Sequence, residues 1–472
     1  MKTVPLFDDW MLDFHQDIVR RFGQPELCEQ KIRCEDDLSI PHAHGDGYVN
    51  VVRDPKRDVY RFWYTMAGQS EIGGKNFNNF LCYMESTDGF NWTRPNLGFA
   101  KRYGFDDTMQ NCVGFDVYPT VISKVTLDTF ESNPARRYKL VTQHIEGHIL
   151  DNNITGRIYV SSDGIDWKII EGSQWYTNRM GSDCDNNLIF NPIAGRYQII
   201  CRPSCLDRRI AIVESEDLVH WTDPQVVLHP DTLDEPLLQF YSMTQYWYHD
   251  YFVGFMQRQH IASSEASACK WLGKIDSELT YSFDGRHWNR TDRQPLIPRC
   301  ELGKPGCEQI YTNSMIEEAN GGLLFYSGGH DVEHCAEAPP ETVNYNIEVL
   351  IHTIRRDGFV YLEPKGGYGT FSTRILIPRN DQLRINVNAP NGYMWMQVSD
   401  SKFNPLPGFS FDDSIPFSGD DIEVIPRWKG GKSAADLIGK NIRLEFRLFQ
   451  ARVYAIHWDF QIQYGDPVIE RI

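Results

Sequence analysis

The sequence has no long apolar run and no dense set of cysteines. Residues 1–5 lead directly into an acidic segment without the apolar stretch of a signal peptide, and no later run approaches membrane-spanning length. The 11 cysteines among 472 residues are odd in number and scattered, which favours reduced thiols over a disulfide framework. These absences predict a cytoplasmic protein with no membrane partner.

Basic residues are also fewer than acidic residues. Lys and Arg number 47 against 64 Asp and Glu, and the formal net charge is −17. This charge works against binding to nucleic acid, so we expect a neutral small-molecule or oligosaccharide substrate and no nucleic-acid partner. Aromatic residues are abundant, at 13%, which agrees with a β-rich protein that handles carbohydrate.

A phrase of the form Ser-x-Asp-Gly-x-x-Trp recurs along the chain. An apolar, strand-like run precedes each copy, and the Asp-Gly step is typical of a tight hairpin turn. Each copy therefore predicts a strand, a turn and a second strand. Four copies and a degenerate fifth occupy residues 86–92, 161–167, 214–221, 281–288 and 356–361.

Two further alternating runs lie between successive copies, so each repeat supplies four strands. Repeats of this kind predict the blades of a β-propeller. Because one blade cannot bury both of its faces alone, five repeats imply a closed ring in which the last blade packs on the first. The predicted blades begin near Gly45, Cys112, Ser182, Leu233 and Glu308.

The pattern changes after about Arg374, where short alternating strands separated by Gly, Asn and Pro predict a β-sandwich. The expected fold class is all-β, a five-bladed β-propeller followed by a β-sandwich. We predict an N-terminal arm at residues 1–38, the propeller at 39–373 and the sandwich at 374–472. Residues 10–22 are compatible with a short helix or with an extended arm.

With these phrases the chain resembles the five-bladed propeller glycosidases, the superfamily of invertases, levansucrases and arabinanases. The run 439–446 is also similar to the closing strands of the sandwich that accompanies invertase-like propellers. The resemblance implies a glycoside hydrolase or transglycosidase that acts on a furanoside (fructofuranoside or arabinofuranoside) or a related small glycoside. It implies that the propeller is the catalytic domain, that axial carboxylates do the chemistry, and that no cofactor is needed.

The resemblance places three acids at the axial ends of inner strands. The first-blade nucleophile or base falls on Asp46, and the third-blade group that holds the sugar falls on Asp185, with Asp183 as its rival. The fourth-blade proton donor falls on Glu235. Glycoside cleavage needs one protonated carboxyl for the leaving oxygen and one ionised carboxylate as nucleophile or base. Inner strands that converge on an axis would bring such distant acids together.

Other side chains are expected to contact the substrate. Histidines in loops at blade ends can hydrogen-bond sugar hydroxyls or tune an acid, and ordinary loop histidines would explain them equally well. A metal site at His330, Asp331 and His334 has weak support from one cluster of unspecified geometry, and no metal is expected. The predicted substrate-binding residues are His44, Asp183, Arg202, His260, Glu308 and His330.

Two reserve acids and several aromatic residues complete the prediction. Asp116 and Glu308 are the reserve acids, and Tyr311 is a candidate for stacking on a sugar. The tryptophans of the repeats are periodic and are expected to pack between blades. These tryptophans are Trp92, Trp167, Trp221 and Trp288.

Three alternative functions stay open. A non-catalytic carbohydrate-binding propeller is favoured by the fourth blade, where Gln239 stands at the position expected for a carboxylate. A sialidase-like enzyme needs an arginine cluster, and Arg202, Arg208 and Arg209 form no clear triad in the sequence. A metal-dependent lyase or isomerase on the same scaffold is suggested by the histidines. A homo-oligomer is also compatible with the sequence.

Overall fold

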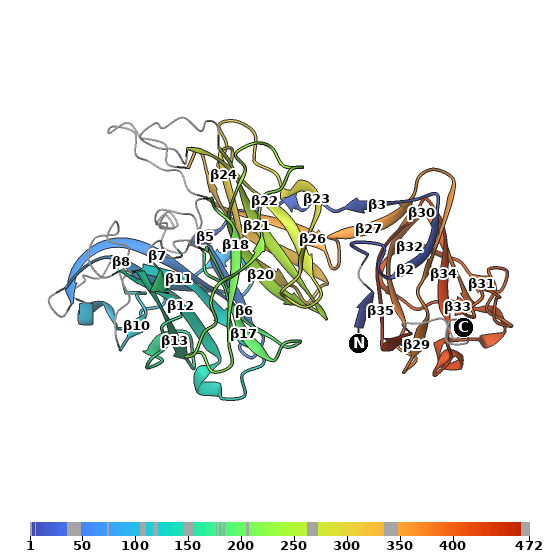
Figure 1. Ribbon diagram of the computed structural model, residues 1–472, viewed down its shortest axis with the longest axis horizontal. Coiled ribbons are helices and arrows are strands. Elements are labelled where there is room, and N and C mark those ends of the chain that lie inside the picture. The colour runs from blue at the N-terminus through green and yellow to red at the C-terminus, as the bar shows by residue number, and fades with distance from the viewer. Residues whose placement is uncertain are drawn as a thin grey trace. The chain divides into compact units, whose positions relative to one another are not determined.

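The structure is a computed structural model made almost entirely of β-strands (Figure 1). In the described part of the chain there is no α-helix, and no helix has the length and hydropathy that crossing a membrane requires. Short 3-10 segments lie at Ala100–Tyr103, Pro134–Arg136, Lys429–Gly431 and Ala434–Leu437. The structure describes residues 2–4, 6–34, 49–72, 75–103, 110–116, 121–145, 154–175, 177–178, 182, 185–203, 207–261, 272–334 and 348–463.

The chain divides into two compact units. The propeller unit consists of Pro25–Glu318 and Leu323–Thr353. The sheet unit consists of Met1–Gln24, Ala319–Gly322 and Ile354–Ile472.

Five blades make up the propeller unit, and each blade begins with its innermost strand. Blade 1 has β6 (Asn50–Asp54), β7 (Val59–Ile72), β8 (Lys75–Ser86) and β9 (Asn91–Trp92), with β5 (Arg33–Cys34) beside β9. Blade 2 has β11 (Val121–Leu127), β12 (Tyr138–Ile145), β13 (Ile154–Ser161) and β14 (Asp166–Ile169), with β10 (Gly114–Phe115) and β15 (Thr177–Asn178). Blade 3 has β16 (Leu188–Asn191), β17 (Arg196–Cys201), β18 (Ile210–Ser215) and β19 (Gln225–Leu228). Blade 4 has β20 (Gln239–Tyr248), β21 (Tyr251–Ile261), β22 (Gly273–Ser282) and β23 (Trp288–Ile297). Blade 5 has β24 (Gln309–Glu317), β25 (Gly322–His330), β26 (Glu348–Arg355) and β4 (Glu26–Leu27).

The innermost strands contact one another in a closed ring, from β6 through β11, β16, β20 and β24 back to β6. At the closing contact, Ser314 Oγ accepts a hydrogen bond from Val51 N at 2.9 Å and donates to Val49 O at 3.0 Å. The last strand of blade 5 is β4, so a segment from near the start of the chain completes the last blade. The predicted all-β propeller is confirmed.

The recurring phrase forms the turn that leads into the outer strand. In blade 1, Ser86 Oγ accepts a hydrogen bond from Gly89 N at 2.9 Å, and Asp88 Oδ1 accepts from Phe90 N and Asn91 N at 2.8 Å. Gly89 has a φ of +79°, which glycine adopts without steric cost. The same serine and aspartate contacts recur at Ser161 and Asp163, Ser215 and Asp217, and Ser282 and Asp284.

The degenerate fifth copy is a different structure, and its prediction as a blade turn is wrong. Its Asp357 lies in the sheet unit, buried and 2.8 Å from His457 Nε2. The strand after it, β27 (Val360–Pro364), pairs with β3 (Ile18–Phe22) and β35 (Arg452–Trp458) rather than with β26. An Asp-Gly turn does not specify which strand will pair with the one that follows it.

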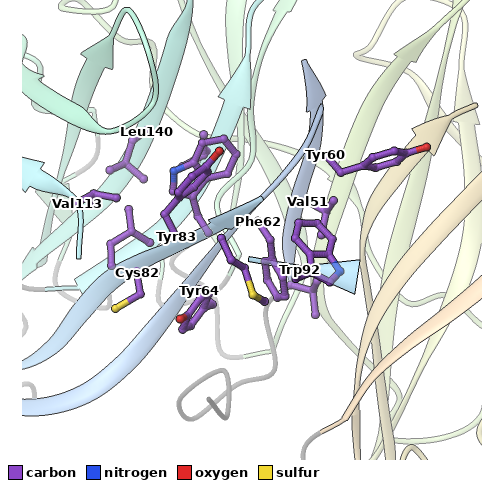
Figure 2. Close-up of a cluster of buried hydrophobic side chains, with 14 of the residues drawn as sticks. Val51, Tyr60, Phe62, Tyr64, Cys82, Tyr83, Trp92, Val113 and Leu140 are labelled. Atoms are coloured by element: carbon purple, nitrogen blue, oxygen red, sulfur yellow. The ribbon is translucent and has the colours of Figure 1, made fainter. Parts of the chain in front are cut away.

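A hydrophobic cluster centred on blade 1 includes residues of both neighbouring blades. Figure 2 shows part of it, with labelled residues from blades 1 and 2. Phe62 is fully buried, and its ring centroid lies 5.6 Å from those of Tyr64 and Trp92. Leu140 of blade 2 and Tyr326 of blade 5 belong to the same cluster, as expected for a closed ring. Of the repeat tryptophans, Trp92, Trp167 and Trp288 are buried in such clusters and Trp221 is partly buried.

The sheet unit differs from the predicted β-sandwich. It contains one antiparallel nine-stranded sheet in the order β2-β28-β34-β30-β35-β27-β3, with β1 on β35 and β32 on β30. The bounds not yet given are β1 (Lys2–Val4), β2 (Leu12–Gln16), β28 (Tyr368–Thr373), β30 (Arg384–Ser399), β32 (Phe417–Val424) and β34 (Arg443–Phe449). Two small pairs accompany it, β29 (Leu376–Pro378) with β36 (Phe460–Ile462) and β31 (Ser414–Ile415) with β33 (Arg427–Trp428).

This sheet is nearly closed. Its edge strands β2 and β3 are consecutive in the chain and are joined through Asp17 alone, whose φ is +55°. The two edges must therefore approach each other, and a single curled sheet replaces two stacked ones. The inner face holds the core, where Phe371 and Phe446 stack with ring centroids 4.5 Å apart.

Phe62→Ala should lower the free energy of unfolding by about 3–5 kcal/mol, because it opens a cavity where blades 1, 2 and 5 pack together. Urea unfolding followed by tryptophan fluorescence measures the change. Leu302→Ala is the control, because Leu302 is 88% exposed. A Phe62→Ala protein as stable as the Leu302→Ala protein would contradict the shared core.

Candidate functional site

The innermost strands begin at one end of the propeller unit, called here the top face. Neighbouring inner strands run in the same direction. For example, Asp185 contacts Thr244, and Asn187, which follows Asp185, contacts Gln245, which follows Thr244. The second strand of each blade runs antiparallel to the first, so its last residues also lie at the top face. The predicted catalytic and substrate-binding residues that the structure describes lie next to these strand ends: Asp185, Arg202, Glu235, His260, Glu308 and His330.

Four polar side chains from four blades meet on the axis below this face. They form the axial cluster of Lys124, Asp185, Thr244 and Asn313. Lys124 Nζ lies 3.1 Å from Asp185 Oδ2 and 2.5 Å from Asn313 O. The same Asp185 oxygen accepts from Thr244 Oγ1 at 3.0 Å and from Asn313 Nδ2 at 2.8 Å. Asp185 is 1% exposed, so its orientation is set by three other blades rather than by solvent.

The axial cluster leaves acceptors unused. Asp185 Oδ1 and Asn313 Oδ1 are buried without a hydrogen-bond partner among the described residues. Burial lowers the pKa of Lys124, and the negative charge of Asp185 opposes that shift. An unsatisfied buried acceptor is costly, so donors from a ligand, such as sugar hydroxyls, would be bound favourably there.

Aromatic and cationic side chains gather near the start of β20. The Tyr241 ring lies beneath the guanidinium groups of Arg202, at 5.2 Å, and Arg208, at 4.8 Å. Arg202 Nη2 donates to Tyr241 O at 2.9 Å, and His334 Nε2 lies 3.3 Å from Tyr241 OH. The ring of Tyr311 is 5.7 Å from that of Tyr241. The predicted sugar-stacking residue Tyr311 and the predicted substrate-binding residue Arg202 thus both contact Tyr241.

His330 belongs to the same part of the top face. Its ring lies 5.5 Å from that of Tyr311. Burial, with the nearby His334, lowers the pKa of His330 to about 4, so the imidazole is neutral near pH 7. Its Nε2 is buried without a hydrogen-bond partner among the described residues and can hydrogen-bond a hydroxyl group.

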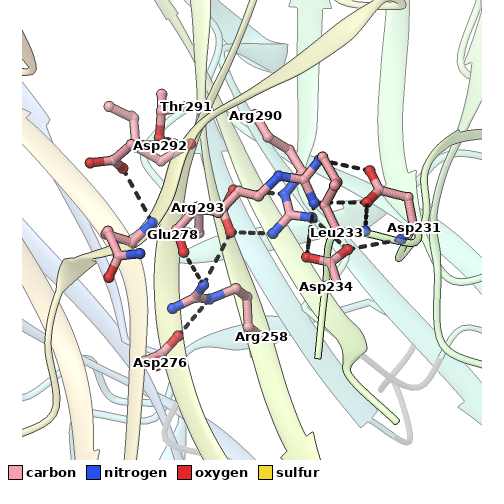
Figure 3. Close-up of polar contacts among 12 residues, drawn as sticks. Asp231, Leu233, Asp234, Arg258, Asp276, Glu278, Arg290, Thr291, Asp292 and Arg293 are labelled. Atoms are coloured by element: carbon pink, nitrogen blue, oxygen red, sulfur yellow. Dashed lines mark hydrogen bonds and ion pairs between the residues drawn. The ribbon is translucent and has the colours of Figure 1, made fainter. Parts of the chain in front are cut away.

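Glu235 lies in a second network, on blade 4. Its carboxylate contacts His260 Nδ1, and His260 Nε2 lies 3.0 Å from Asp276 Oδ2. Asp276 Oδ1 accepts from Arg258 Nε at 2.8 Å, and Arg258 Nη1 is 3.4 Å from Glu278 (Figure 3). Burial opposes the charged form of His260, but hydrogen bonds and charges from Asp276 and Glu235 outweigh it and raise the pKa.

Ion pairs anchor the loop that carries Glu235. Arg290 holds Asp234 with contacts of 2.6 and 2.7 Å, and Arg293 lies 2.7 Å from Asp231 (Figure 3). The side chain of Glu235 is nevertheless 52% exposed. Loop 231–235 is therefore fixed to blade 4 while its predicted proton donor faces solvent.

Two of the predicted catalytic acids, Asp185 and Glu235, belong to different hydrogen-bond networks. Among the described residues, the contacts of Asp185 and those of Glu235 form two networks with no shared side chain. The reserve acids are engaged elsewhere: Glu308 lies 2.9 Å from Lys274 Nζ, and Asp116 accepts from Ile169 N at 3.1 Å. Three predicted residues, His44, Asp46 and Asp183, lie outside the described residues.

Several side chains of the site were not predicted: Lys124, Thr244, Asn313, Tyr241 and Asp276. The available signal was a charged or polar residue within an apolar strand, as Lys124 is within residues 121–127. Of the three arginines considered for a triad, Arg202 and Arg208 meet at Tyr241, whereas Arg209 pairs with Asp207 at 2.8 Å. Within the described ranges, no group of three or more His, Cys, Asp or Glu is placed to hold a metal ion.

No protein-family model and no curated protein matches the sequence. Among solved structures, the chain is similar to an N-acetylgalactosamine deacetylase from F. plautii in complex with blood group B trisaccharide (14% identity, TM-score 0.45, 73% of this chain and 97% of that one). It is also similar to a β-1,2-mannobiose phosphorylase from Listeria innocua (12%, 0.44, 72% and 97%). A third match is a thermostable family-43 glycoside hydrolase (12%, 0.43, 66% and 91%). The matches at this low identity include glycoside hydrolases and phosphorylases.

Lys124→Met should destabilise the protein by about 3–5 kcal/mol, because it leaves the Asp185 carboxylate buried without its counter-charge. The double variant Lys124→Met with Asp185→Asn should recover much of this loss, since neither charge then remains. Urea unfolding of both single variants and the double variant measures the coupling. Additive losses would contradict the pairing of the two side chains.

His260 should make stability depend on pH. Because its pKa is raised above 6.5 in the folded state, its contribution is fully present below that value and is lost as the pH rises through the folded pKa. The difference in free energy of unfolding between wild type and His260→Gln should therefore shrink from about pH 6 to pH 9. Urea unfolding across this range measures it, with the exposed His229→Gln as control. A constant difference would exclude His260 as the titrating group.

Proposed function

We propose that this chain cleaves or transfers a glycosidic bond at the top face of its propeller, as a glycoside hydrolase or transglycosidase. The observation that carries the proposal is the axial cluster, in which Lys124, Thr244 and Asn313 fix the buried carboxylate of Asp185. A carboxylate held rigidly on an axis, with one oxygen unused, suits a group that binds a sugar and stabilises positive charge developing at its anomeric carbon.

The other groups at the top face support a carbohydrate ligand. Tyr241 and Tyr311 offer aromatic surface for the apolar face of a sugar ring. His330 and Asn313 offer buried polar atoms to its hydroxyl groups. The substrate that we propose is a furanoside or a related small glycoside, a choice that rests on the resemblance of the sequence to invertases, levansucrases and arabinanases. The proposed cytoplasmic location also rests on the sequence alone.

In the proposed reaction, Glu235 gives a proton to the leaving oxygen as the bond from the anomeric carbon to that oxygen breaks. Asp46 acts as nucleophile, or as base for the attacking water or acceptor hydroxyl. Asp185 stays ionised and holds the sugar. For this division of roles, the substrate must span from the axial cluster to the loop at residues 231–235, where His260 contacts Glu235.

A non-catalytic carbohydrate-binding propeller is the second candidate. It is favoured by the axial cluster itself, because Asp185 is its single carboxylate among the described residues and is paired with Lys124. Such a site would bind sugar hydroxyls without supplying the second carboxyl group that glycoside cleavage needs.

Asp46→Asn, Asp185→Asn and Glu235→Gln should each reduce turnover of a susceptible glycoside by about 10²–10⁴-fold, because each removes a group that moves a proton or stabilises charge. The measurement is kcat and KM on aryl furanosides, aryl pyranosides and natural oligosaccharides. The exposed Asp223 provides the control carboxylate, as Asp223→Asn, and circular dichroism checks the fold of every variant.

Two outcomes would decide against parts of the proposal. Turnover that survives in Asp46→Asn would remove that residue from the mechanism. Binding of oligosaccharides by wild type, with no bond cleaved in the whole panel, would favour the non-catalytic propeller.

A further inference from the structure

Four aromatic side chains gather on the outer face of the sheet unit. They are Tyr368 on β28, Phe449 on β34, and Tyr393 and Trp395 on β30, and together they are called the aromatic patch. Tyr368 is 58% exposed and Tyr393 is 45% exposed. Large aromatic side chains gathered in solvent on one sheet face are uncommon unless they bind something.

The register of the sheet creates this patch. Tyr368 and Tyr393 both pair with Phe449, one from each side, so three rings form a row across adjacent strands. Trp395 lies two residues after Tyr393 on β30, and its ring centroid is 5.5 Å from that of Tyr393 and 6.0 Å from that of Tyr368. The intervening residues of β30, including Met394, point inward and are buried. The rings are therefore not needed to fill the core.

A cavity of about 480 Å³ is lined by residues that neighbour the aromatic patch along the chain. Its lining includes Gly367, which precedes Tyr368, and Gln450, which follows Phe449. Asn391 lines it two residues before Tyr393. Glu363 and Arg452, also in the lining, form an ion pair at 3.1 Å. Its size is that of ligand sites, about 300–1,000 Å³.

We propose that the aromatic patch and this cavity form a second carbohydrate-binding site, which takes a neutral glycan chain. The rings stack against the C–H faces of sugar units, and the amide and charged groups of the cavity hydrogen-bond the hydroxyls. Five of the ten lining residues are polar or charged, namely Glu363, Asn388, Asn391, Gln450 and Arg452, and such groups suit a hydroxyl-rich ligand better than an apolar protein surface. The net charge of −17 disfavours a polyanionic glycan.

This site goes beyond the proposed function, because it needs no chemistry in the propeller. Its role would be to hold a glycan on the protein whether or not that glycan is cleaved. Binding by the sheet unit and turnover at the top face can therefore be measured separately.

Affinity electrophoresis of the full-length chain tests the site, with arabinan, levan, β-mannan or polygalacturonate cast in the gel. We expect at least one neutral polysaccharide to retard the wild type. Tyr393→Ala with Trp395→Ala should weaken that binding by about tenfold or more, because two stacking surfaces are lost. Tyr393→Phe with Trp395→Phe keeps the rings and should restore most of it.

The control is Phe130→Ala, which removes an aromatic side chain of the propeller unit that is 47% exposed. It should bind as the wild type does. Unchanged retardation of the Tyr393→Ala and Trp395→Ala double variant would overturn the proposal, as would no retardation of the wild type by any neutral polysaccharide. Salt-sensitive retardation by polygalacturonate alone would indicate a charge interaction instead. A wild-type dimer that the double variant converts to a monomer, measured by light scattering, would make the patch a protein interface.

The same variants separate this site from the proposed catalysis. The alanine double variant should turn over a small aryl glycoside as fast as the wild type. A chain that binds polysaccharide through the patch but cleaves no glycoside would retain this inference and lose the proposed function. A chain that cleaves a glycoside but binds no polysaccharide would retain the proposed function and lose this inference.

Discussion

Closure of the blade ring is the constraint on which the rest of the propeller unit depends. Each blade has two apolar faces, and only a closed ring gives each face a partner. Blade 1 shows this directly, since Phe62 shares one cluster with Leu140 of blade 2 and Tyr326 of blade 5. The contact of Ser314 with β6 and the pairing of β4 with β26 in blade 5 complete the ring. The burial of each blade therefore depends on the closure of the whole ring.

The axial cluster follows from that closure. Five inner strands converge on a narrow axis, and any polar side chain there must find its partners on other blades. Asp185 takes Lys124, Thr244 and Asn313 as partners from three blades. Holding the carboxylate from three sides restricts its rotation, which is what the charge-stabilising role proposed for Asp185 requires. Closure of the blade ring therefore both stabilises the propeller unit and fixes the orientation of the Asp185 carboxylate.

Features formed by residues close together in the sequence could be predicted. Contacts between residues far apart in the sequence could not. The serine and aspartate turns were predictable because each is complete within a few residues. Asp185 was predicted from the resemblance to five-bladed propeller glycosidases, which places an acid at the start of the third inner strand. Its partner Lys124 is 61 residues away and lies within an apolar strand, where no local pattern relates the two. Glu235 and His260 were each predicted, but their contact, and the role of Asp276 beside them, depends on the pairing of β21 with β22.

The sheet unit shows a different limit. Alternating residues specify that one face of each strand is buried, which holds equally for a sandwich and for one curled sheet. The strands β2 and β3 decide between these two folds. They lie at opposite edges of the sheet and are joined only through Asp17, so the two edges must lie close together. Once the sheet has closed, its inner face contains a complete core that includes Phe371 and Phe446. The exposed rings of Tyr368 and Tyr393 add nothing to that core, so the fold alone does not explain why aromatic residues stand there.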